Sequence, residues 1–226
     1  MTKSIVLVSG GMDSLVTAAI AHSESKSSEH LYFLHMNYGQ KTESKELWCF
    51  HKIADHYQVL SDHRKIVDIS FLKEIGGSSL TDSKMQVSDF KGESTAIPTS
   101  YVPFRNTIII SLAVAWAEVV GAVRIYIGAV HEDSSGYPDC RPSYYKAMNK
   151  LIHEGTKATS IHVVTPVIHL SKDKIIQQGV DLHAPFEYTW SCYKAEDAAC
   201  GVCDSCALRL RAFARLGMTD PIKYRS

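Results

Sequence analysis

The sequence has no excess of charge of either sign. Its 24 lysines and arginines are balanced by 24 aspartates and glutamates. A balanced chain has no overall electrostatic attraction to the phosphates of a nucleic acid or to an anionic membrane. We therefore expect neither a nucleic acid nor a membrane as a partner, and any anionic ligand has to be held by a local site.

A long uninterrupted apolar run is also missing. The most apolar long stretch, Ile108 to Val123, carries Glu118 and is shorter than the roughly 20 residues that a membrane-spanning helix needs. We interpret it as a buried helix. The apolar run near the start covers only residues 5–8 and is followed by glycines, so no secretory signal is expected. These features predict a soluble, cytoplasmic protein.

The cysteines lack the even distribution of a disulfide framework. Two of the six stand apart, and four crowd into one short segment: Cys192, Cys200, Cys203 and Cys206. In a reducing cytosol such a cluster is typical of a metal site. Four thiolates complete a tetrahedron around Zn²⁺ and leave no position for water, so one structural zinc ion per chain is expected. An iron–sulfur cluster is a less favoured alternative, and incidental reduced cysteines are a third.

Short β-prone segments alternate with helical patterns along the chain. The expected strands are residues 5–8, 31–35, 65–69, 124–129 and 162–167, and the expected helices are residues 14–21, 42–57, 106–120 and 142–154. This alternation predicts an α/β fold with a parallel five-stranded sheet and helices on both faces. Ligands of such sheets bind at the carboxyl ends of the strands.

The character of the sequence changes near residue 181. We expect residues 1–180 to form the α/β domain, and residues 181–226 to form a small helical tail that carries the cysteines and packs on the same domain. Residues 22–30 are polar and predict a surface loop. Residues 76–100 lack periodicity and predict a long loop, which in a compact domain is more often functional or disordered than inert.

A glycine loop, Ser9-Gly10-Gly11-Met12-Asp13-Ser14, connects the first expected strand to a helix. It lacks the lysine of a Walker A loop and the spaced glycines of a GxGxxG motif. Its backbone N–H groups and the helix dipole favour an anion such as phosphate. Asp13 would repel a bare phosphate, so we infer a divalent cation, Mg²⁺, between Asp13 and a polyphosphate. The alternative is a plain strand-to-helix turn with a capping side chain.

Polar side chains also follow other expected strands or begin helices, where they would reach the ligand edge of the sheet. An arginine at a helix start suits an anion, a second one can pair a carboxylate through two bonds, and an aspartate can accept from a guanidine-like edge. Turn, cap and surface roles are the alternatives. The candidates for substrate contact are Tyr38, Gln40, Arg105, Asn106, Asp133, Tyr137, Asp139 and Arg141.

The glycine loop resembles the SGGxDS signature of the PP-loop ATP pyrophosphatases. In that family the loop grips the β,γ-pyrophosphate of ATP while the α-phosphorus is attacked, which gives an adenylate and pyrophosphate. The resemblance implies that ATP binds along one continuous segment: Val8, Ser9, Gly10, Gly11, Met12, Asp13, Ser14, Leu15, Val16, Thr17 and Ala18.

Further motifs resemble one branch of that family, the 7-cyano-7-deazaguanine synthases of queuosine biosynthesis. NYGQ, VPFRN, AVHEDSSGYPDCRPSYY, TPVIHLSKDKII and the cysteine pattern occur in that order and span nearly the whole chain. Position 12 carries Met where relatives often have Gln or Leu, and residues 76–100 have no clear match. The first motif alone is shared by many PP-loop enzymes, whereas the Tyr-Pro-Asp-Cys-Arg segment and the cysteines are more specific.

The resemblance implies a ligase that forms carbon–nitrogen bonds. Its substrates would be 7-carboxy-7-deazaguanine, free ammonia and ATP, and two successive adenylations, of the acid and then of the amide, would lead to the nitrile. Asp13, Ser14, Arg105 and Arg141 would be catalytic, because two anions have to be brought together and their charge neutralised. The relatives also imply a homodimer.

Two other interpretations stay open. Another PP-loop enzyme could adenylate a tRNA base, although the balanced charge is against a large tRNA-binding face. A nucleotide-binding or zinc-bearing module without catalysis could use the same scaffold. The gathering of polar residues at several strand ends favours an enzyme.

Overall fold

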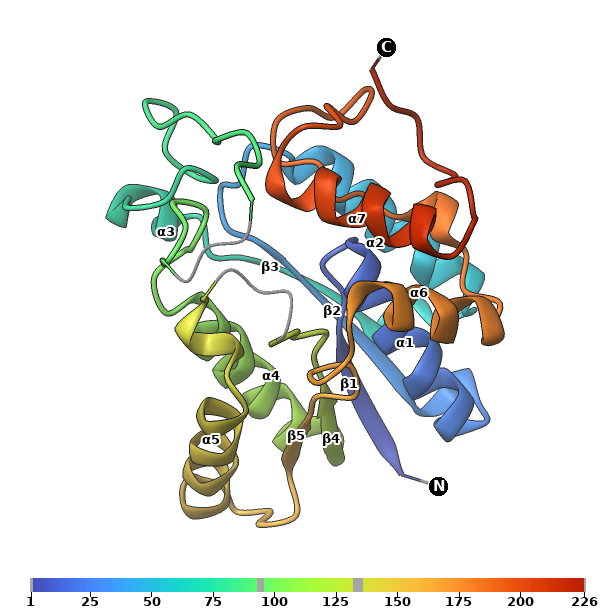
Figure 1. Ribbon diagram of the computed structural model, residues 1–226. Helices are drawn as coiled ribbons and strands as arrows, with labels where there is room; N and C mark the ends of the chain where they lie inside the picture. Colours follow the sequence, from blue (N-terminus) through green and yellow to red (C-terminus); the bar gives the residue numbers. More distant parts are fainter. Residues whose placement is uncertain (1, 93–95, 132–135, 226) are drawn as a thin grey trace.

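The computed structural model describes residues 2–92, 96–131 and 136–225 (Figure 1). Asp133, one of the predicted substrate contacts, lies outside the described residues. Within them, one sheet contains the strands β1 (Lys3–Leu7), β2 (Leu31–Asn37), β3 (Arg64–Asp68), β4 (Ala122–Tyr126) and β5 (His162–Val164). Their spatial order is β3-β2-β1-β4-β5, and every neighbouring pair is parallel. The predicted fold class and all of the predicted strands are confirmed.

The central strand β1 shows why the sheet carries helices on both faces. Successive side chains of a strand point to opposite faces. Ile5 and Leu7 belong to one apolar cluster, whereas Val6 and Val8 belong to a second cluster on the other face. A strand buried on both faces reads as a continuous apolar run, as β1 does.

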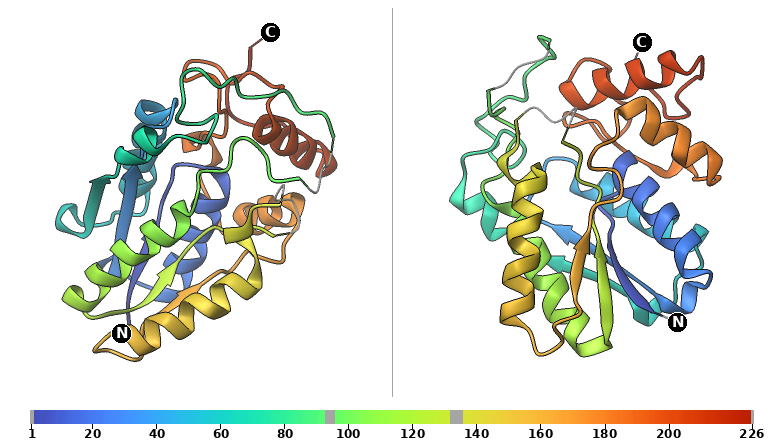
Figure 2. Two further views of the ribbon diagram at one scale, coloured as in Figure 1. Left: turned by 90° about the vertical axis from the view of Figure 1, so that its left-hand side faces the viewer. Right: turned by 60° about the horizontal axis from the view of Figure 1, so that its bottom comes forward.

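The helices divide between these two cores as Figure 2 shows. One face carries α1 (Met12–Ser25), α2 (Glu43–His56), α6 (Lys172–Asp181) and α7 (Asp204–Arg215). The other carries α3 (Phe71–Ile75), α4 (Arg105–Val120) and α5 (Pro142–Gly155). Short 3₁₀ turns lie at Ser28–His30, Ser61–His63, Pro138–Cys140 and Phe186–Tyr188.

Two local predictions need correction. The expected loop at residues 22–30 is largely helical, since α1 continues to Ser25 and ends at Lys26 in the left-handed conformation. The polar side chains of residues 22–25 form the exposed last turn of α1. A search for apolar periodicity overlooks such a turn because it contains no apolar residues of the helix pattern. The apolar stretch expected to form a buried helix is α4, but only one side of it is buried: Ala113 and Ala117 are enclosed, whereas Val119 is 83% exposed. Within the described ranges, no helix has the length and apolarity to cross a membrane.

The described part of the segment 76–100 has no helix or strand, as predicted. It is nevertheless tied to the body of the protein. The backbone N–H of Ser79 donates to Thr99, and Leu80 accepts from the backbone of Lys41. Further along, the N–H of Phe90 donates to the carbonyl of Val202, so this segment also contacts the cysteine-bearing part of the chain.

Candidate functional site

A cavity of about 300 Å³ lies at the carboxyl ends of the central strands. Residues at the ends of β1 and β2 line it, and Ile127 and Gly128 line it just after β4. The strand order reverses between β1 and β4, and at such a switch point the connections leave on opposite faces and open a crevice. The volume falls at the small end of the range typical of ligand sites.

The glycine loop is packed so closely that side chains are excluded at two positions. Gly10 has a φ of +87°, and a Cβ there would lie 2.6 Å from the carbonyl oxygen of Glu46 on α2. A Cβ on Gly128 would lie 2.8 Å from the carbonyl of Asp13. Only glycine suits a left-handed conformation and such close backbone approach at little cost. The loop is therefore held between α2 and the segment that follows β4.

The predicted ATP-binding segment, residues 8–18, presents its first part to the cavity and its second part to the core. The lining residues are Val8, Ser9, Gly11, Met12, Asp13 and Ser14. Ser14 donates its hydroxyl to the carbonyl of Gly11 at 2.8 Å, which closes the turn into α1. Gly10 does not line the cavity, and neither do the last four members of the predicted segment, which are buried in α1: Leu15, Val16, Thr17 and Ala18.

Asp13 is paired with a lysine that comes from a distant part of the chain. Nζ of Lys172, the first residue of α6, lies 2.6 Å from Oδ2 of Asp13. The other oxygen, Oδ1, is buried and has no hydrogen-bond partner among the described residues. Carboxylate oxygens are the ligands that Mg²⁺ prefers, so an unpaired oxygen at a glycine loop fits the inferred cation. The fold also supplies the lysine that the loop motif lacks.

Sequence reasoning missed Lys172, although a signal was present. A cation at the start of a helix faces the positive end of the helix dipole, which is unfavourable unless an anion lies nearby. Lys172 stands at that position in α6, within the TPVIHLSKDKII motif. Asp13 is that anion in the structure.

The start of α4 forms another part of the cavity wall. The guanidinium carbon of Arg105 lies 4.8 Å from the centre of the Tyr38 ring, and both residues line the cavity. Asn106 also lines it and donates its backbone N–H to Asp139 at 3.3 Å. Burial raises the pKa of Asp139, and the charge of Arg105 opposes that shift. Asp139 is buried and does not line the cavity. Its carboxylate holds the first turn of α4 by accepting the N–H of Asn106.

Glu46 is a second cavity residue that sequence reasoning missed. Gln40 accepts from the backbone of Tyr38 at 2.8 Å and donates to Glu46 at 3.1 Å. Thr42 donates to the other oxygen of Glu46 at 2.7 Å. Burial raises the pKa of Glu46 to about 7, although these two donors and the charge of Arg105 pull it down. Gln40, a predicted substrate contact, is thus a buried support for Glu46.

The segment before α5 is divided between the cavity and the surface. Tyr137 lines the cavity, and its hydroxyl lies 2.7 Å from that of Ser100. Arg141 is exposed at the start of α5 and is not part of the cavity wall. Of the two arginines predicted to be catalytic, only Arg105 faces the cavity.

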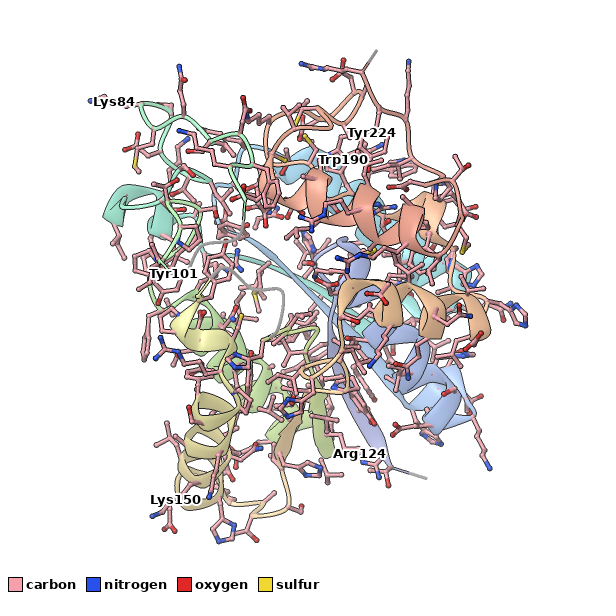
Figure 3. The ribbon with its side chains drawn as sticks, in the orientation of Figure 1. Lys84, Tyr101, Arg124, Lys150, Trp190 and Tyr224 are labelled. Atoms are coloured by element: carbon pink, nitrogen blue, oxygen red, sulfur yellow. The ribbon has the colours of Figure 1, made fainter. Side chains whose placement is uncertain are left out.

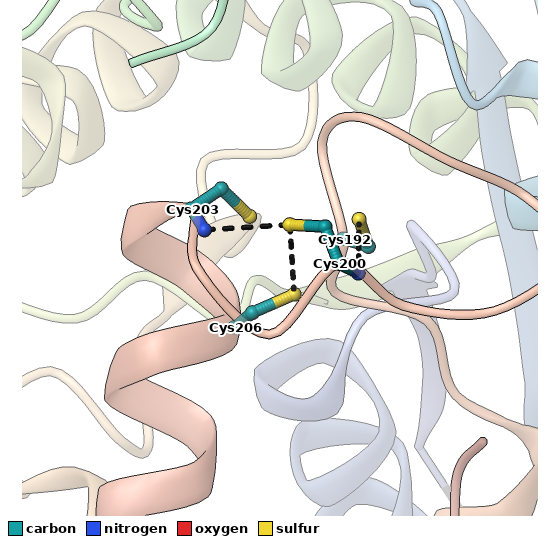
Figure 4. Close-up of side chains that lie close together, drawn as sticks. All are labelled: Cys192, Cys200, Cys203 and Cys206. Carbon is teal, nitrogen blue, oxygen red and sulfur yellow. Dashed lines mark hydrogen bonds between the residues drawn. The ribbon is translucent and has the colours of Figure 1, made fainter. Parts of the chain in front are cut away.

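The four clustered cysteines come together as predicted (Figure 4). Their sulfur atoms all lie within 4.8 Å of one another. Backbone N–H groups of Lys194 and Cys200 donate to the sulfur of Cys192, and that of Cys203 donates to Cys200. Without a metal the thiols share their protons unequally: hydrogen bonds from neighbouring thiols lower the pKa of Cys192, and the same hydrogen bonds raise the pKa of Cys203 and of Cys206. N–H donors directed at sulfur stabilise thiolates, so this group fits a tetrahedral metal.

The cysteine-bearing segment also forms one side of the cavity. Trp190 lies at the end of the molecule that holds α7 (Figure 3), and its backbone N–H donates to the carbonyl of Gly10 at 2.9 Å. Other residues of this segment that line the cavity are Ser191, Tyr193, Asp204, Ser205, Leu208 and Arg209. The metal-type site and the glycine loop are therefore parts of one structural unit.

A parallel α/β sheet with such a glycine loop defines a class, the PP-loop or adenine nucleotide α-hydrolase-like proteins. A solved structure with this architecture is the U34-tRNA thiolase NcsA from Methanococcus maripaludis with its [4Fe-4S] cluster. The two chains are 14% identical with a TM-score of 0.51, and the match covers 95% of this chain and 64% of that chain. At this identity the likeness shows the fold alone.

Within that class, the chain belongs to the family of the queuosine biosynthesis protein QueC, whose model matches residues 3–217. It is similar to the 7-cyano-7-deazaguanine synthase of Chlorobaculum parvum, with 56% identity over 223 residues, 98% of this chain and 96% of that one. It is 57% identical over 225 residues to the 7-cyano-7-deazaguanine synthase of Chlorobium chlorochromatii, 99% of this chain and 96% of that one. These relatives are synthases, so the family is one of enzymes.

Proposed function

We propose that this chain is an ATP-dependent ligase that converts 7-carboxy-7-deazaguanine and ammonia to 7-cyano-7-deazaguanine. The observation that carries the proposal is the pairing of Asp13 with Lys172 in a cavity that Arg105 also lines. A metal ligand and a cation beside the glycine loop suit a triphosphate, and an arginine that lines the same cavity suits a carboxylate. The relatives are named for the nitrile product, and the family resemblance implies 7-carboxy-7-deazaguanine as the carboxylate.

The glycine loop and Lys172 would hold the pyrophosphate part of ATP. Backbone N–H groups at the start of α1 would face the anion, and Ser9 and Ser14 would add hydroxyl groups. Mg²⁺ bound at Asp13 would neutralise part of the triphosphate charge. Lys172 lies beside the same carboxylate and adds a second cation, so the α-phosphorus becomes more open to attack by another anion.

Arg105 would direct the carboxylate of the substrate toward the α-phosphorus. Attack gives an acyl adenylate and pyrophosphate, and ammonia then displaces AMP to give the amide. In a second cycle the amide oxygen attacks the α-phosphorus of another ATP, takes up AMP and releases a second pyrophosphate. Loss of AMP together with a proton from nitrogen leaves the nitrile. Arg105 is better placed for this role than Arg141, because it lines the cavity and Arg141 is exposed.

Both halves of this reaction release protons from nitrogen. Ammonia becomes positively charged as it adds to the acyl adenylate, and elimination of AMP from the adenylated amide requires loss of an N–H proton. Glu46 lines the cavity, and its pKa of about 7 suits a proton acceptor at neutral pH. Gln40 and Thr42 hold its two oxygens in place.

The remaining features of the proposal follow from the resemblance. We propose zinc as the metal of the cysteine cluster and divide the chain into residues 1–180, which bind ATP, and residues 181–226, which bind zinc. Location in the cytoplasm and a homodimeric state stay predictions. Sedimentation of the purified protein tests the second of these.

The proposed function predicts a specific product. Incubation of the protein with ATP, magnesium, ammonia and 7-carboxy-7-deazaguanine should yield the nitrile, identified by its mass, together with AMP and pyrophosphate. Omission of ammonia should stop the reaction at the adenylate. Formation of the amide alone would contradict the second adenylation. If only tRNA drives pyrophosphate release, the enzyme is instead one that adenylates a tRNA base.

Glu46→Gln should lower the rate by at least about 10²-fold, the usual minimum contribution of a positioned general base. In the unsubstituted protein the rate should rise with pH through about 7, because the carboxylate accepts a proton only when it is ionised. This rise of the rate near pH 7 should be absent from Glu46→Gln. The pH profile has to be measured at a constant concentration of unprotonated ammonia, since ammonium itself titrates.

Glu43→Gln is a matched control for this substitution. Glu43 lies three residues earlier on α2 and accepts from the backbone of Gly39, but it does not line the cavity. Its replacement should leave the profile unchanged. An unchanged inflection in Glu46→Gln would assign the proton acceptor to another group.

A further inference from the structure

Arg209 of α7 is a charged side chain that is only 1% exposed. It forms a two-pronged ion pair with Asp220, at 2.7 Å from Nε and 2.8 Å from Nη2. Its other contacts are Oγ1 of Thr189 at 2.7 Å, Oγ of Ser191 at 3.2 Å and the carbonyl of Phe186 at 3.4 Å. A guanidinium has five N–H donors, and all five are engaged. Although Arg209 borders the cavity, it has no donor left for a ligand and acts by positioning other groups.

The groups that Arg209 holds lie against the glycine loop. Thr189 and Ser191 are the neighbours of Trp190 on either side, and both accept from the same guanidinium nitrogen. The backbone N–H of Trp190 donates to the carbonyl of Gly10 at 2.9 Å. Because the same glycine abuts the backbone of Glu46 on its other side, the loop has little room to shift unless residues 189–191 move.

The same contacts lead to the cysteine cluster. Cys192 directly follows Ser191 in the chain, and Cys206 precedes Arg209 by one turn of α7, so that both side chains lie on one face of the helix. Asp220, the carboxylate partner of Arg209, also accepts a hydrogen bond from the hydroxyl of Tyr224 at 2.6 Å. The backbone beside Tyr224 pairs with Ala199, the residue before Cys200. Figure 3 labels Trp190 and Tyr224 at the same end of the molecule.

We propose that Arg209 couples the metal site to the nucleotide site, so that binding of the metal and binding of ATP strengthen each other. The inference rests on the proposed binding of ATP to the glycine loop. A bound metal fixes Cys192 and Cys206, and through Arg209 it fixes Thr189, Trp190 and the carbonyl of Gly10. Coupling between two binding sites is reciprocal, so a loop ordered by ATP also holds the sulfur atoms in the geometry that the metal needs.

The test measures zinc affinity with and without nucleotide. The zinc-loaded protein is titrated to equilibrium with a chelator of known affinity, in the absence and presence of saturating magnesium–ATP, and zinc transfer is followed by the absorbance of the chelator. ATP binding to each variant is measured separately by equilibrium dialysis. The variants are Arg209→Lys, which keeps the charge but loses the planar guanidinium, and Thr189→Val, which at nearly constant volume removes the hydroxyl that accepts from Arg209 and donates to the carbonyl of Phe186. Arg64→Lys is the control, because Arg64 likewise bonds one carboxylate and backbone carbonyls, but far from the cavity.

In the unsubstituted protein and in Arg64→Lys, ATP should raise the zinc affinity by at least about fivefold, the lower end of typical coupling. In Arg209→Lys and Thr189→Val, the factor by which ATP raises the zinc affinity should fall toward one. ATP should bind to these variants correspondingly more weakly. If Arg209→Lys does not fold, Thr189→Val carries the test. The same factor in the variants as in the unsubstituted protein overturns the role of Arg209. A protein that binds ATP but shows no change in zinc affinity overturns the coupling alone, whereas a protein that binds no ATP contradicts the proposed function itself.

Discussion

Replacement of Asp13 with alanine is expected to abolish the formation of AMP, with a loss of at least about 10²–10³-fold, while the protein stays folded. This range is typical for removal of one group that stabilises charge in a transition state. Asp13 is placed to hold the cation of the triphosphate and to orient Lys172. Oδ1 of Asp13 makes no hydrogen bond to any described residue, so removal of this oxygen costs little stability. Single-turnover formation of AMP and a thermal melt measure the two effects.

Lys172→Met should have a similar effect on the rate, because Lys172 is the cation beside that carboxylate. The double variant should be little worse than either single one, since residues that act as a unit are not additive. Glu24→Gln is the control: Glu24 also forms a bridge to a cation, Arg124, but at the opposite end of the sheet. Additive losses in the double variant would show that Asp13 and Lys172 act separately, and turnover near the unsubstituted rate in Asp13→Ala would refute the assignment of the loop.

Replacement of Cys206 with serine is expected to have the largest effect on stability. The sulfur of Cys206 lies with three others in a group that fits one metal ion, and a metal bound only by the folded chain contributes its binding energy to folding. A loss of at least about 4 kcal/mol corresponds to a fall in Tm of about 8–16 °C for a domain of this size. Metal content per chain should fall in parallel, and elemental analysis should find zinc rather than iron in the unsubstituted protein.

Cys49→Ala is the matched control for this prediction. Cys49 is fully buried in the same apolar cluster as the four cysteines, but it is not one of the residues whose sulfur atoms gather. Its replacement should lower Tm by a few degrees at most and leave the metal content unchanged. A stable Cys206→Ser variant that keeps its metal would contradict the four-cysteine site, and iron in the purified protein would favour the iron–sulfur alternative.

Local patterns predicted the sheet, because strands buried on both faces are continuous apolar runs. Residues 5–8 are such a run, and they correspond closely to β1. The four clustered cysteines were predicted for a similar reason, since their closeness in the chain limits their separation in space. The polar end of α1 was harder to place, because an exposed helix turn carries no periodic apolar signal.

Contacts between distant segments were beyond any local pattern. Lys172 lies 159 residues from Asp13 in the chain, and only the packing of α6 beside α1 brings them together. Nothing near Glu46 in the sequence distinguishes it from an ordinary helix residue. Only the fold places it on the wall of the cavity. Conversely, Arg141 stood in a specific motif, yet its place at the start of α5 leaves it exposed.

The sequence by itself determined the class of the fold, the glycine loop, the metal-type cluster and the family, because each depends on residues that are close in the chain or follow one another in order. The tertiary structure decided which side chains share one cavity. It supplied Lys172 and Glu46, turned Leu15 to Ala18 into the core and brought the cysteine-bearing segment against the glycine loop through Trp190. The physical reason is that such proximity depends on the order of the strands and on how the helices pack against the sheet, which no short segment encodes.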